Sequence, residues 1–180
     1  MARLKILMAP DARLKKVAEK VEKVDESIQK ILDDMLETMY AANGIGLAAT
    51  QVDIHKRLVV IDVECDENGM NKKPLYFINP ELVKTSDDLN VYQEGCLSLP
   101  NAFDEVERPA TCTVKALDYN GKEFTMDCEG LLATCIQHEI DHLDGIIFAD
   151  HLSRLKRTRM LTKLEKSKKR KEYSDEIFQY

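Results

Sequence analysis

The sequence predicts an α+β fold in which mostly antiparallel sheets pack around one central helix, with a further helix at the C-terminus. Two observations lead to this prediction. Helical patterns occur near both ends of the chain and strand patterns occupy its middle, an order typical of α+β proteins. In the middle, residues 111–128 alternate apolar and polar side chains around Asn120-Gly121, a strong signal for an antiparallel hairpin.

Two helices are expected in the N-terminal part of the chain, over residues 11–21 and 25–42. The second has an apolar stripe whose members recur at steps of three and four residues. The stripe consists of Ile28, Ile31, Leu32, Met35 and Met39. Asn43-Gly44 ends this helix, and the tight segment "GIGLAATQ" follows at 44–51.

Strands and two more helices are expected in the rest of the chain. "RLVVIDV" at 57–63 and "PLYFINPELV" at 74–83 have the composition of strands and are separated by a polar loop. "VYQEGCLSLP" at 91–100 is predicted as a short extended segment. Residues 129–143 form the predicted central helix, and residues 152–171 form the C-terminal one.

The length and composition fit one domain. A chain of 180 residues that is 44% hydrophobic and 32% charged is typical of a globular protein with a single core. No apolar run approaches the roughly 18 residues that a membrane span needs, and the N-terminus lacks the pattern of a secretory signal. We therefore expect a cytoplasmic protein with no membrane contact.

The charge is unevenly spread along the chain. Residues 154–171 hold ten Lys and Arg and one Glu, so they carry +9, and the remainder of a chain with net charge −6 carries −15. This asymmetry indicates a basic arm on an acidic body. The arm alone fits a solvated helix, a non-specific RNA contact or a docking arm, but it lacks the interleaved aromatic residues that stack on bases.

The stretch "QHEIDHLDG" in the predicted central helix points to the chemistry of the chain. His138 and His142 would project from one helix face, one turn apart, where two imidazoles can hold a metal ion. Leu131 and Cys135 share that face, which directs the histidines towards the protein interior. Glu139 lies one position round and could reach a water on the metal. The pattern favours a metal-binding helix, although histidines without a metal can also show it.

A third ligand has to come from elsewhere. His151 follows the pair across a helix-breaking glycine, so it is not expected to join them. Five cysteines, an odd number without paired spacing, favour free thiols or a metal ligand over a disulfide framework. Cys96 in "QEGCLSLP" can expose its sulfur at a bend, but on spacing alone it is no better than Cys112 or Cys128.

Three separated segments, "GIGLAATQ", "EGCLS" and "HEIDH", resemble in this order the three motifs of the peptide deformylases. The resemblance reaches essentially every defined motif position and extends from about Ile6 to the start of the C-terminal helix. It implies that Cys96 joins His138 and His142 as the third ligand. It also implies the activity, which is removal of the formyl group from the N-terminal formylmethionine of newly synthesised polypeptides, with release of formate.

The resemblance further implies a metal-dependent mechanism. Three protein ligands leave a fourth position for water, which is the mark of a catalytic site. That water would attack the formyl carbon, with Glu139 as general base and then as general acid. Similarity to the family assigns Gln51 and the backbone N–H of Leu97 to the oxygen that becomes negative. One Fe²⁺ or Zn²⁺ ion is expected per chain.

Residues around the ligands are expected to bind substrate and to position the histidines. By resemblance, Ile45, Gly46 and Gly95 line a groove in which the peptide lies like an added strand. The methionine side chain would enter a pocket that includes Tyr92, Leu131 and Cys135. Because metal-bound histidines usually donate their second N–H to a carboxylate, Glu94 and Asp141 are candidates for this role, with Arg108 as a charge partner for either.

The resemblance also bears on domains and partners. Residues 1–153 are expected to form the catalytic metal-hydrolase part, and residues 154–180 a basic helix and tail of the same domain. Nascent formylmethionyl polypeptides are the expected partners, with ribosome contact through the basic helix and no DNA contact. Two alternatives stay open at this point: a catalytically silent homologue that binds the ribosome or another partner, and an endopeptidase of the H-E-x-x-H kind.

Overall fold

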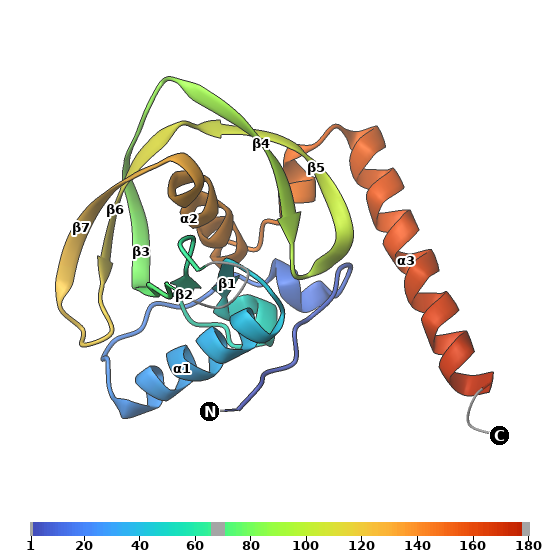
Figure 1. Ribbon diagram of the computed structural model, residues 1–180, viewed down its shortest axis with the longest axis horizontal. Helices are drawn as coiled ribbons and strands as arrows, with labels where there is room; N and C mark the ends of the chain where they lie inside the picture. The colour runs from blue at the N-terminus through green and yellow to red at the C-terminus, as the bar shows by residue number, and fades with distance from the viewer. Residues whose placement is uncertain (1, 66–70, 178–180) are drawn as a thin grey trace.

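A five-stranded antiparallel sheet lies beside the central helix of the protein (Figure 1). The structure, a computed structural model, describes residues 2–65 and 71–177, with side chains up to residue 170. The strands run in the order β1-β2-β3-β6-β7. They are β1 Gly46–Ala48, β2 Leu58–Ile61, β3 Leu75–Thr85, β6 Thr111–Leu117 and β7 Glu123–Glu129. β6 and β7 form the hairpin predicted around Asn120-Gly121, and Gly121 adopts the positive φ of 81° that this turn requires.

A separate two-stranded sheet and three helices complete the fold. β4 (Leu89–Cys96) and β5 (Leu99–Pro109) pair antiparallel in the second sheet. The helices are α1 (Glu26–Ala41), α2 (Gly130–Leu143) and α3 (Arg154–Ile177). Figure 1 shows α2 in the middle of the molecule, between the five-stranded sheet and the β4–β5 sheet. The predicted α+β class, with antiparallel sheets around one helix, is therefore confirmed.

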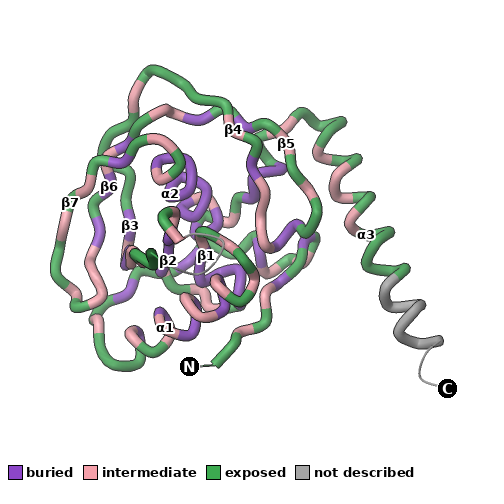
Figure 2. Tube along the Cα trace, viewed as in Figure 1, coloured by how far each residue is buried: buried purple, intermediate pink, exposed green. Residues whose placement is uncertain are grey.

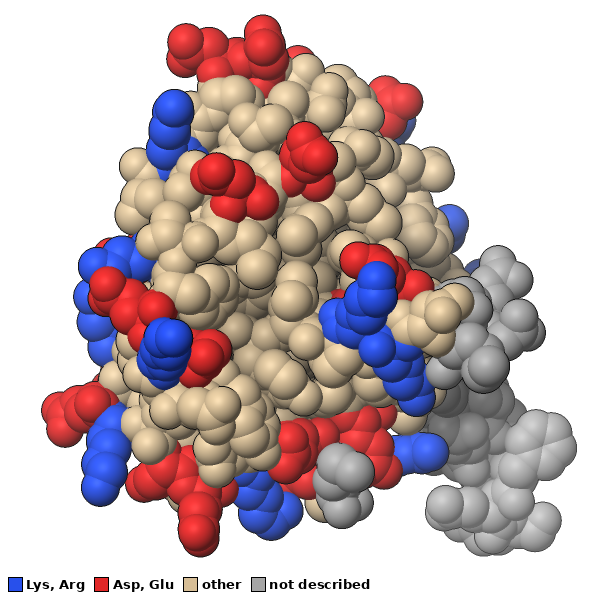
Figure 3. Space-filling view, turned by 60° about the vertical axis from the view of Figure 1, so that its left-hand side comes forward, with Lys and Arg blue, Asp and Glu red and all other residues tan. Residues whose placement is uncertain are grey.

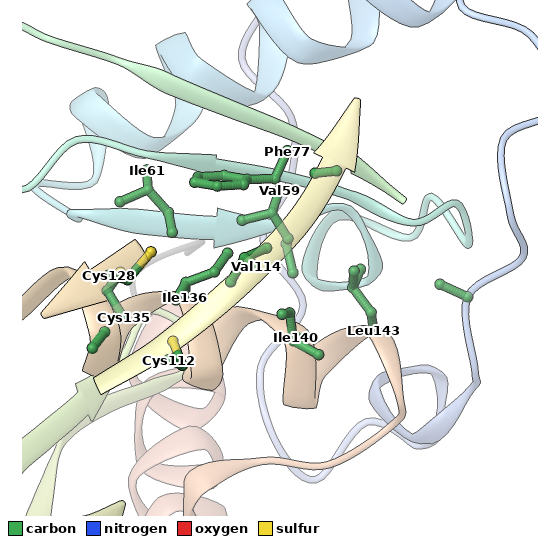
Figure 4. Close-up of a cluster of buried hydrophobic side chains, with 14 residues drawn as sticks. Val59, Ile61, Phe77, Cys112, Val114, Cys128, Cys135, Ile136, Ile140 and Leu143 are labelled. Carbon is green, nitrogen blue, oxygen red and sulfur yellow. The ribbon is translucent and has the colours of Figure 1, made fainter. Parts of the chain in front are cut away.

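The strand β2 explains why the five-stranded sheet has a helix on each face. Its sequence "LVVI" is fully buried, so alternate side chains enter different cores. Val59 and Ile61 pack with residues of α2, whereas Leu58 and Val60 pack with residues of α1. Figure 4 shows the first of these cores and Figure 2 shows that α2 is buried along most of its length.

A third core lies between the N-terminal segment, β5 and α3. Leu99 and Phe148 are its largest fully buried members. Met160, Leu161 and Leu164 of α3 pack against it, which fixes the first half of α3 on the body of the protein.

None of the helices in the described part of the chain has the length and apolarity needed to cross a membrane. Figure 3 shows one face on which acidic and basic side chains are interspersed around a mostly uncharged middle.

The prediction of a helix over residues 11–21 is wrong. Only the short 3-10 helix η1 (Ala12–Lys15) forms there, and Lys16 is already extended. Beyond it the backbone binds other parts of the chain, because the N–H of Ala18 donates to the carbonyl of Leu143 and Glu19 bridges Lys56. These tertiary hydrogen bonds replace the local ones that a helix would make.

Other element boundaries also differ from those expected. The segment 91–100 belongs to two strands that reverse at Leu97 and Ser98, and β5 continues to Pro109 without having been predicted. "GIGLAATQ" contains β1 and the 3-10 helix η2 (Ala49–Val52). A further 3-10 helix, η3 (Phe148–His151), precedes α3. Of the polar loop predicted between the strands at 57–63 and 74–83, residues 66–70 lie outside those described.

Candidate active site

Helix α2 and the end of β4 bring together the three residues that the sequence suggested as metal ligands. The Nε2 atoms of His138 and His142 lie 3.2 Å apart. The Sγ of Cys96 lies 3.2 Å from Nε2 of His142. Their potential ligand atoms all fall within 4.8 Å of one another, and no other group of three or more His, Cys, Asp or Glu residues in the described ranges does so.

The chemistry of this cluster fits a divalent metal ion. Nδ1 of His138 lies 2.9 Å from Glu94 Oε2, and because Glu94 is ionised, Nδ1 is the donor. Burial opposes protonation of His138, but hydrogen bonds with Cys96 and Glu94 raise the pKa of His138 well above its ordinary value, so a metal ion would bind Nε2 by displacing a proton. Burial lowers the pKa of His142 well below its ordinary value, which keeps that imidazole neutral. Two imidazoles and one cysteine sulfur form a donor set that suits Zn²⁺ or Fe²⁺.

Glu139 lies beside these ligands with one oxygen unpaired. The residue is 4% exposed, and its buried Oε2 has no hydrogen-bond partner among the described residues. Burial raises the pKa of its carboxyl to about 7, despite the opposing effect of His138. A Cβ on Gly46 would stand 2.5 Å from Glu139 Oε1, so glycine at that position lets β1 come close to the carboxylate. A carboxyl group in this state can both accept and release a proton near neutral pH.

The side chain of Gln51 points into the same region from η2. Its Oε1 accepts a hydrogen bond from the N–H of Ala48 (2.9 Å), and its Nε2 donates to Ser98 Oγ (3.1 Å). Nε2 also lies 3.5 Å from Cys96 Sγ, so its second N–H is directed towards the ligand cluster. Leu97 follows Cys96 at the reversal between β4 and β5 and lines the cavity described below.

A buried ion-pair network stands behind the ligands. Arg108 donates from Nε and Nη2 to the two oxygens of Glu94, and from Nη1 to Asp141 Oδ2 at 2.8 Å. Burial alone would raise the pKa of Glu94, but hydrogen bonds from His138 and Arg108 outweigh it and lower that pKa. The pKa of Asp141 is lowered in the same way, by His151 and Arg108 acting against burial. Arg108 therefore pairs with both acids, where the sequence left the choice between them open.

A cavity of about 610 Å³ opens onto this site. It contains all six residues that the resemblance linked to the substrate. They are Ile45, Gly46, Tyr92, Gly95, Leu131 and Cys135. Glu139, Gln51 and Leu97 also line the cavity, together with Cys96 and His138, so a molecule bound there would touch the reactive groups.

Comparison with known proteins identifies the chain at the level of its family. Residues 3–158 match the family described as Polypeptide deformylase. The chain belongs to this family. A peptide deformylase is an enzyme that removes the formyl group from the N-terminal methionine of a polypeptide, and the family is one of metalloenzymes.

Individual peptide deformylases are similar to the chain over nearly its whole length. "Peptide deformylase 1" of Burkholderia multivorans is 57% identical over 166 residues, which are 92% of this chain and 90% of the relative. A crystal structure of peptide deformylase from Ehrlichia chaffeensis has a TM-score of 0.88 at 44% identity, covering 94% of this chain and 99% of that one. A Met-Ala-Ser-bound peptide deformylase from Acinetobacter baumannii has a TM-score of 0.78 at 30% identity, covering 84% of this chain and 99% of that one.

Two residues that contact the candidate site were not predicted from the sequence. Ser98, the acceptor for the Gln51 amide, lies within the motif "EGCLS", so the motif itself held a signal for it. The second is His151, for which the sequence predicted no role in the site. It lies outside the ligand cluster, with its Nε2 2.7 Å from Asp141 Oδ2. No pattern in the sequence indicated this pairing.

Proposed function

We propose that the chain hydrolyses the formyl group of N-terminal formylmethionine with one divalent metal ion held by Cys96, His138 and His142. The observation that carries this proposal is the convergence of one sulfur and two Nε2 atoms at a cavity that also contains the buried carboxyl of Glu139. Because the donor set suits both, the ion is Fe²⁺ or Zn²⁺. When bound, such an ion lowers the pKa of a water that it holds and polarises a carbonyl oxygen.

The protein side chains supply the proton transfers. Glu139 accepts a proton from the attacking water and then passes it to the departing amine. Its raised pKa supports this double role, since a group that titrates near neutral pH can act in both directions. The free Oε2 leaves room for the hydrogen bond that the first step requires.

Two donors would stabilise the negative oxygen of the tetrahedral intermediate. The second N–H of Gln51 Nε2 is one, because the first is held by Ser98. The backbone N–H of Leu97 is the other. The contact from Gln51 Oε1 to Ala48 fixes the orientation of the amide, so that nitrogen rather than oxygen faces the site.

The substrate would lie along the backbone of Ile45, Gly46 and Gly95. A side chain would not fit at position 95, since a Cβ on Gly95 would stand 2.4 Å from the Phe103 ring. The methionine side chain would enter the part of the cavity lined by Tyr92, Leu131 and Cys135. The apolar lining of this part matches a thioether side chain.

Behind the site, Glu94, Arg108 and Asp141 would position His138 and keep its imidazole in the ligating tautomer.

The test of this function is formate release from formyl-Met-Ala-Ser. Chelator-treated protein is reconstituted anaerobically with Fe²⁺, or with Zn²⁺, and compared with the metal-free protein. We expect release only from the reconstituted samples, and none from acetyl-Met-Ala-Ser because a methyl group is larger than the formyl hydrogen. Equal rates with and without metal, or cleavage of an internal peptide bond, would contradict the proposal.

We also propose that α3 contacts the ribosome in the cytoplasm, where formylated polypeptides are made. Ten cationic residues within 154–171 suit a phosphate backbone. Co-sedimentation with ribosomes should weaken steeply as salt rises, and truncation after Ser153 should abolish it. Hydrolysis of a short formyl peptide by the truncated chain checks that it still folds. Salt-independent binding, or binding retained by the folded truncation, would argue against this contact.

A further inference from the structure

A second hollow lies next to the catalytic cavity, between α3 and the β4–β5 sheet. It measures about 680 Å³, and we call it the α3 groove. Its apolar surface includes Ala9 and Ala102 on the body of the protein and Met160 and Leu164 on α3. Figure 1 shows α3 running alongside β5, and the groove residues of α3 lie between Lys156 and Lys168. Met160 and Leu164 also pack against the third core, which holds this wall of the groove on the body of the protein.

The α3 groove adjoins the catalytic cavity. Met8, Pro100, Asn101 and Phe103 line both hollows. Phe103 stands at this junction with 62% of its surface exposed, an unusual fraction for a large aromatic side chain. A chain that leaves the catalytic cavity past Phe103 would therefore reach the α3 groove directly.

The charged residues that line the α3 groove are mostly cationic. Four cationic residues line it, namely Lys156, Arg159, Lys163 and Lys168, against the single acid Asp104. Asp104 is already paired with Lys156 at 2.7 Å. Arg159 and Lys163 make no ion pair with any residue that the structure describes. Two cations thus face the groove without a partner, although the body of the protein is acidic.

We propose that the α3 groove binds the part of the formylated polypeptide that follows its first three residues, and that it favours acidic side chains there. This inference rests on the proposed function, because the occupant is the substrate itself. A polypeptide substrate is longer than the catalytic cavity and has to leave it, and the adjoining groove offers apolar residues along its path. Arg159 and Lys163 supply the charge that carboxylates would meet.

The dimensions agree with this path. From Lys156 to Lys168 α3 rises about 18 Å, at roughly 1.5 Å per residue. Five residues of extended chain span about 17 Å. An octapeptide is therefore long enough to place its last five residues along the groove while its formyl end is in the catalytic site.

The experiment compares three substrates with the full-length, metal-loaded protein. They are formyl-Met-Ala-Ser and two octapeptides that begin with the same three residues. The five residues that follow include two Glu in one octapeptide and two Lys in the other, and are otherwise the same. Exposed ion pairs are individually weak, so two of them should raise kcat/KM for the Glu octapeptide by about three- to tenfold over the Lys octapeptide. The difference should lie in KM and shrink as salt rises.

Two double variants give the matched comparison. Arg159→Glu with Lys163→Glu reverses the charge inside the groove, and Lys166→Glu with Arg170→Glu makes the same change on α3 residues that do not line it. Glutamate is a good helix former, so neither should break α3. The groove variant should lose or invert the preference for the Glu octapeptide, and the control variant should keep it.

The tripeptide ends before the groove and reports on the catalytic site and on folding in each protein. Equal kcat/KM for the two octapeptides in the native protein would overturn the inference. So would an equal loss of preference in both variants, because that would show a general effect of charge rather than a groove. A groove variant that loses only ribosome binding would assign the groove to RNA instead. If the metal-loaded native protein leaves the tripeptide intact, the proposed function itself fails.

Discussion

Arg108 and Glu94 form a bidentate ion pair inside the protein, with Nη2 of Arg108 3.0 Å from Oε2 of Glu94. The same Oε2 accepts the hydrogen bond from Nδ1 of His138. Both side chains are almost fully buried. The Arg108 guanidinium thus binds the carboxylate that sets the tautomer of His138, a proposed metal ligand. It also binds Asp141, the residue before His142 in the sequence.

Replacing Arg108 should destabilise the folded protein strongly. Arg108→Met keeps much of the side-chain volume but leaves Glu94 and Asp141 without their shared cation. Removing one partner of a buried ion pair costs about 3–5 kcal/mol, because the remaining charge is uncompensated. Urea unfolding of the metal-free variant and native proteins measures the difference. A loss below about 1 kcal/mol would show that the network contributes little to stability.

The loss of unfolding free energy caused by Arg108→Met should also depend on pH. In the native protein the pKa values of Glu94 and Asp141 are lowered, so their contribution to stability is present above the unfolded value of about 4 and is lost as pH falls through the folded values. Without Arg108 the two acids take up protons more readily. The difference in unfolding free energy between the metal-free native and variant proteins should therefore shrink as pH falls from 7 through about 4 to the lowered pKa values of the native protein. A constant difference would contradict the charge argument.

Glu94→Gln should weaken metal binding without removing a ligand. The amide cannot act as the ionised acceptor that holds Nδ1 of His138. Loss of such a partner typically costs about 10- to 100-fold in metal affinity. Competition with a chelator of known affinity gives the value. Unchanged affinity in a folded Glu94→Gln protein would remove Glu94 from the positioning of His138.

Gln51→Leu should reduce kcat by about 100- to 1,000-fold, because it removes one donor to the developing oxyanion. KM for formyl-Met-Ala-Ser and the metal content should change little. Ser98→Ala is the matched control, since it removes the partner of the Gln51 amide and keeps the donor itself. We expect the control to lose less than about tenfold in kcat. Equal losses in both variants would reduce Gln51 to a structural role.

The central helix and the hairpin at 111–128 were predictable because their signals are local. A helix of this spacing puts His138 and His142 on one face whatever surrounds it, and Asn120-Gly121 specifies its own turn. The position of Cys96 beside the histidines is different, because it depends on how β4 packs on α2. Spacing could not separate Cys96 from Cys112 and Cys128, and the motif resemblance was needed.

Contacts between distant segments account for what the sequence did not reveal. Residues 16–21 have a helical composition, but Ala18 bonds to Leu143 and Val21 bonds to the side chain of Asn79. The two-stranded pairing of β5 with β4 was missed because many of the β5 side chains are exposed and charged, which weakens an apolar alternation. The pairing of His151 with Asp141 likewise requires η3 to return towards α2.

The role of Glu139 is the central claim, and formate release by Glu139→Gln tests it most directly. The substitution keeps the shape of the side chain but removes the group that accepts and returns the proton. Native and variant proteins are reconstituted with the same metal, their metal content is measured, and formyl-Met-Ala-Ser is the substrate. We predict equal metal content and a loss of kcat of about 100- to 10,000-fold. A metal-loaded Glu139→Gln protein that releases formate at the native rate would contradict the account.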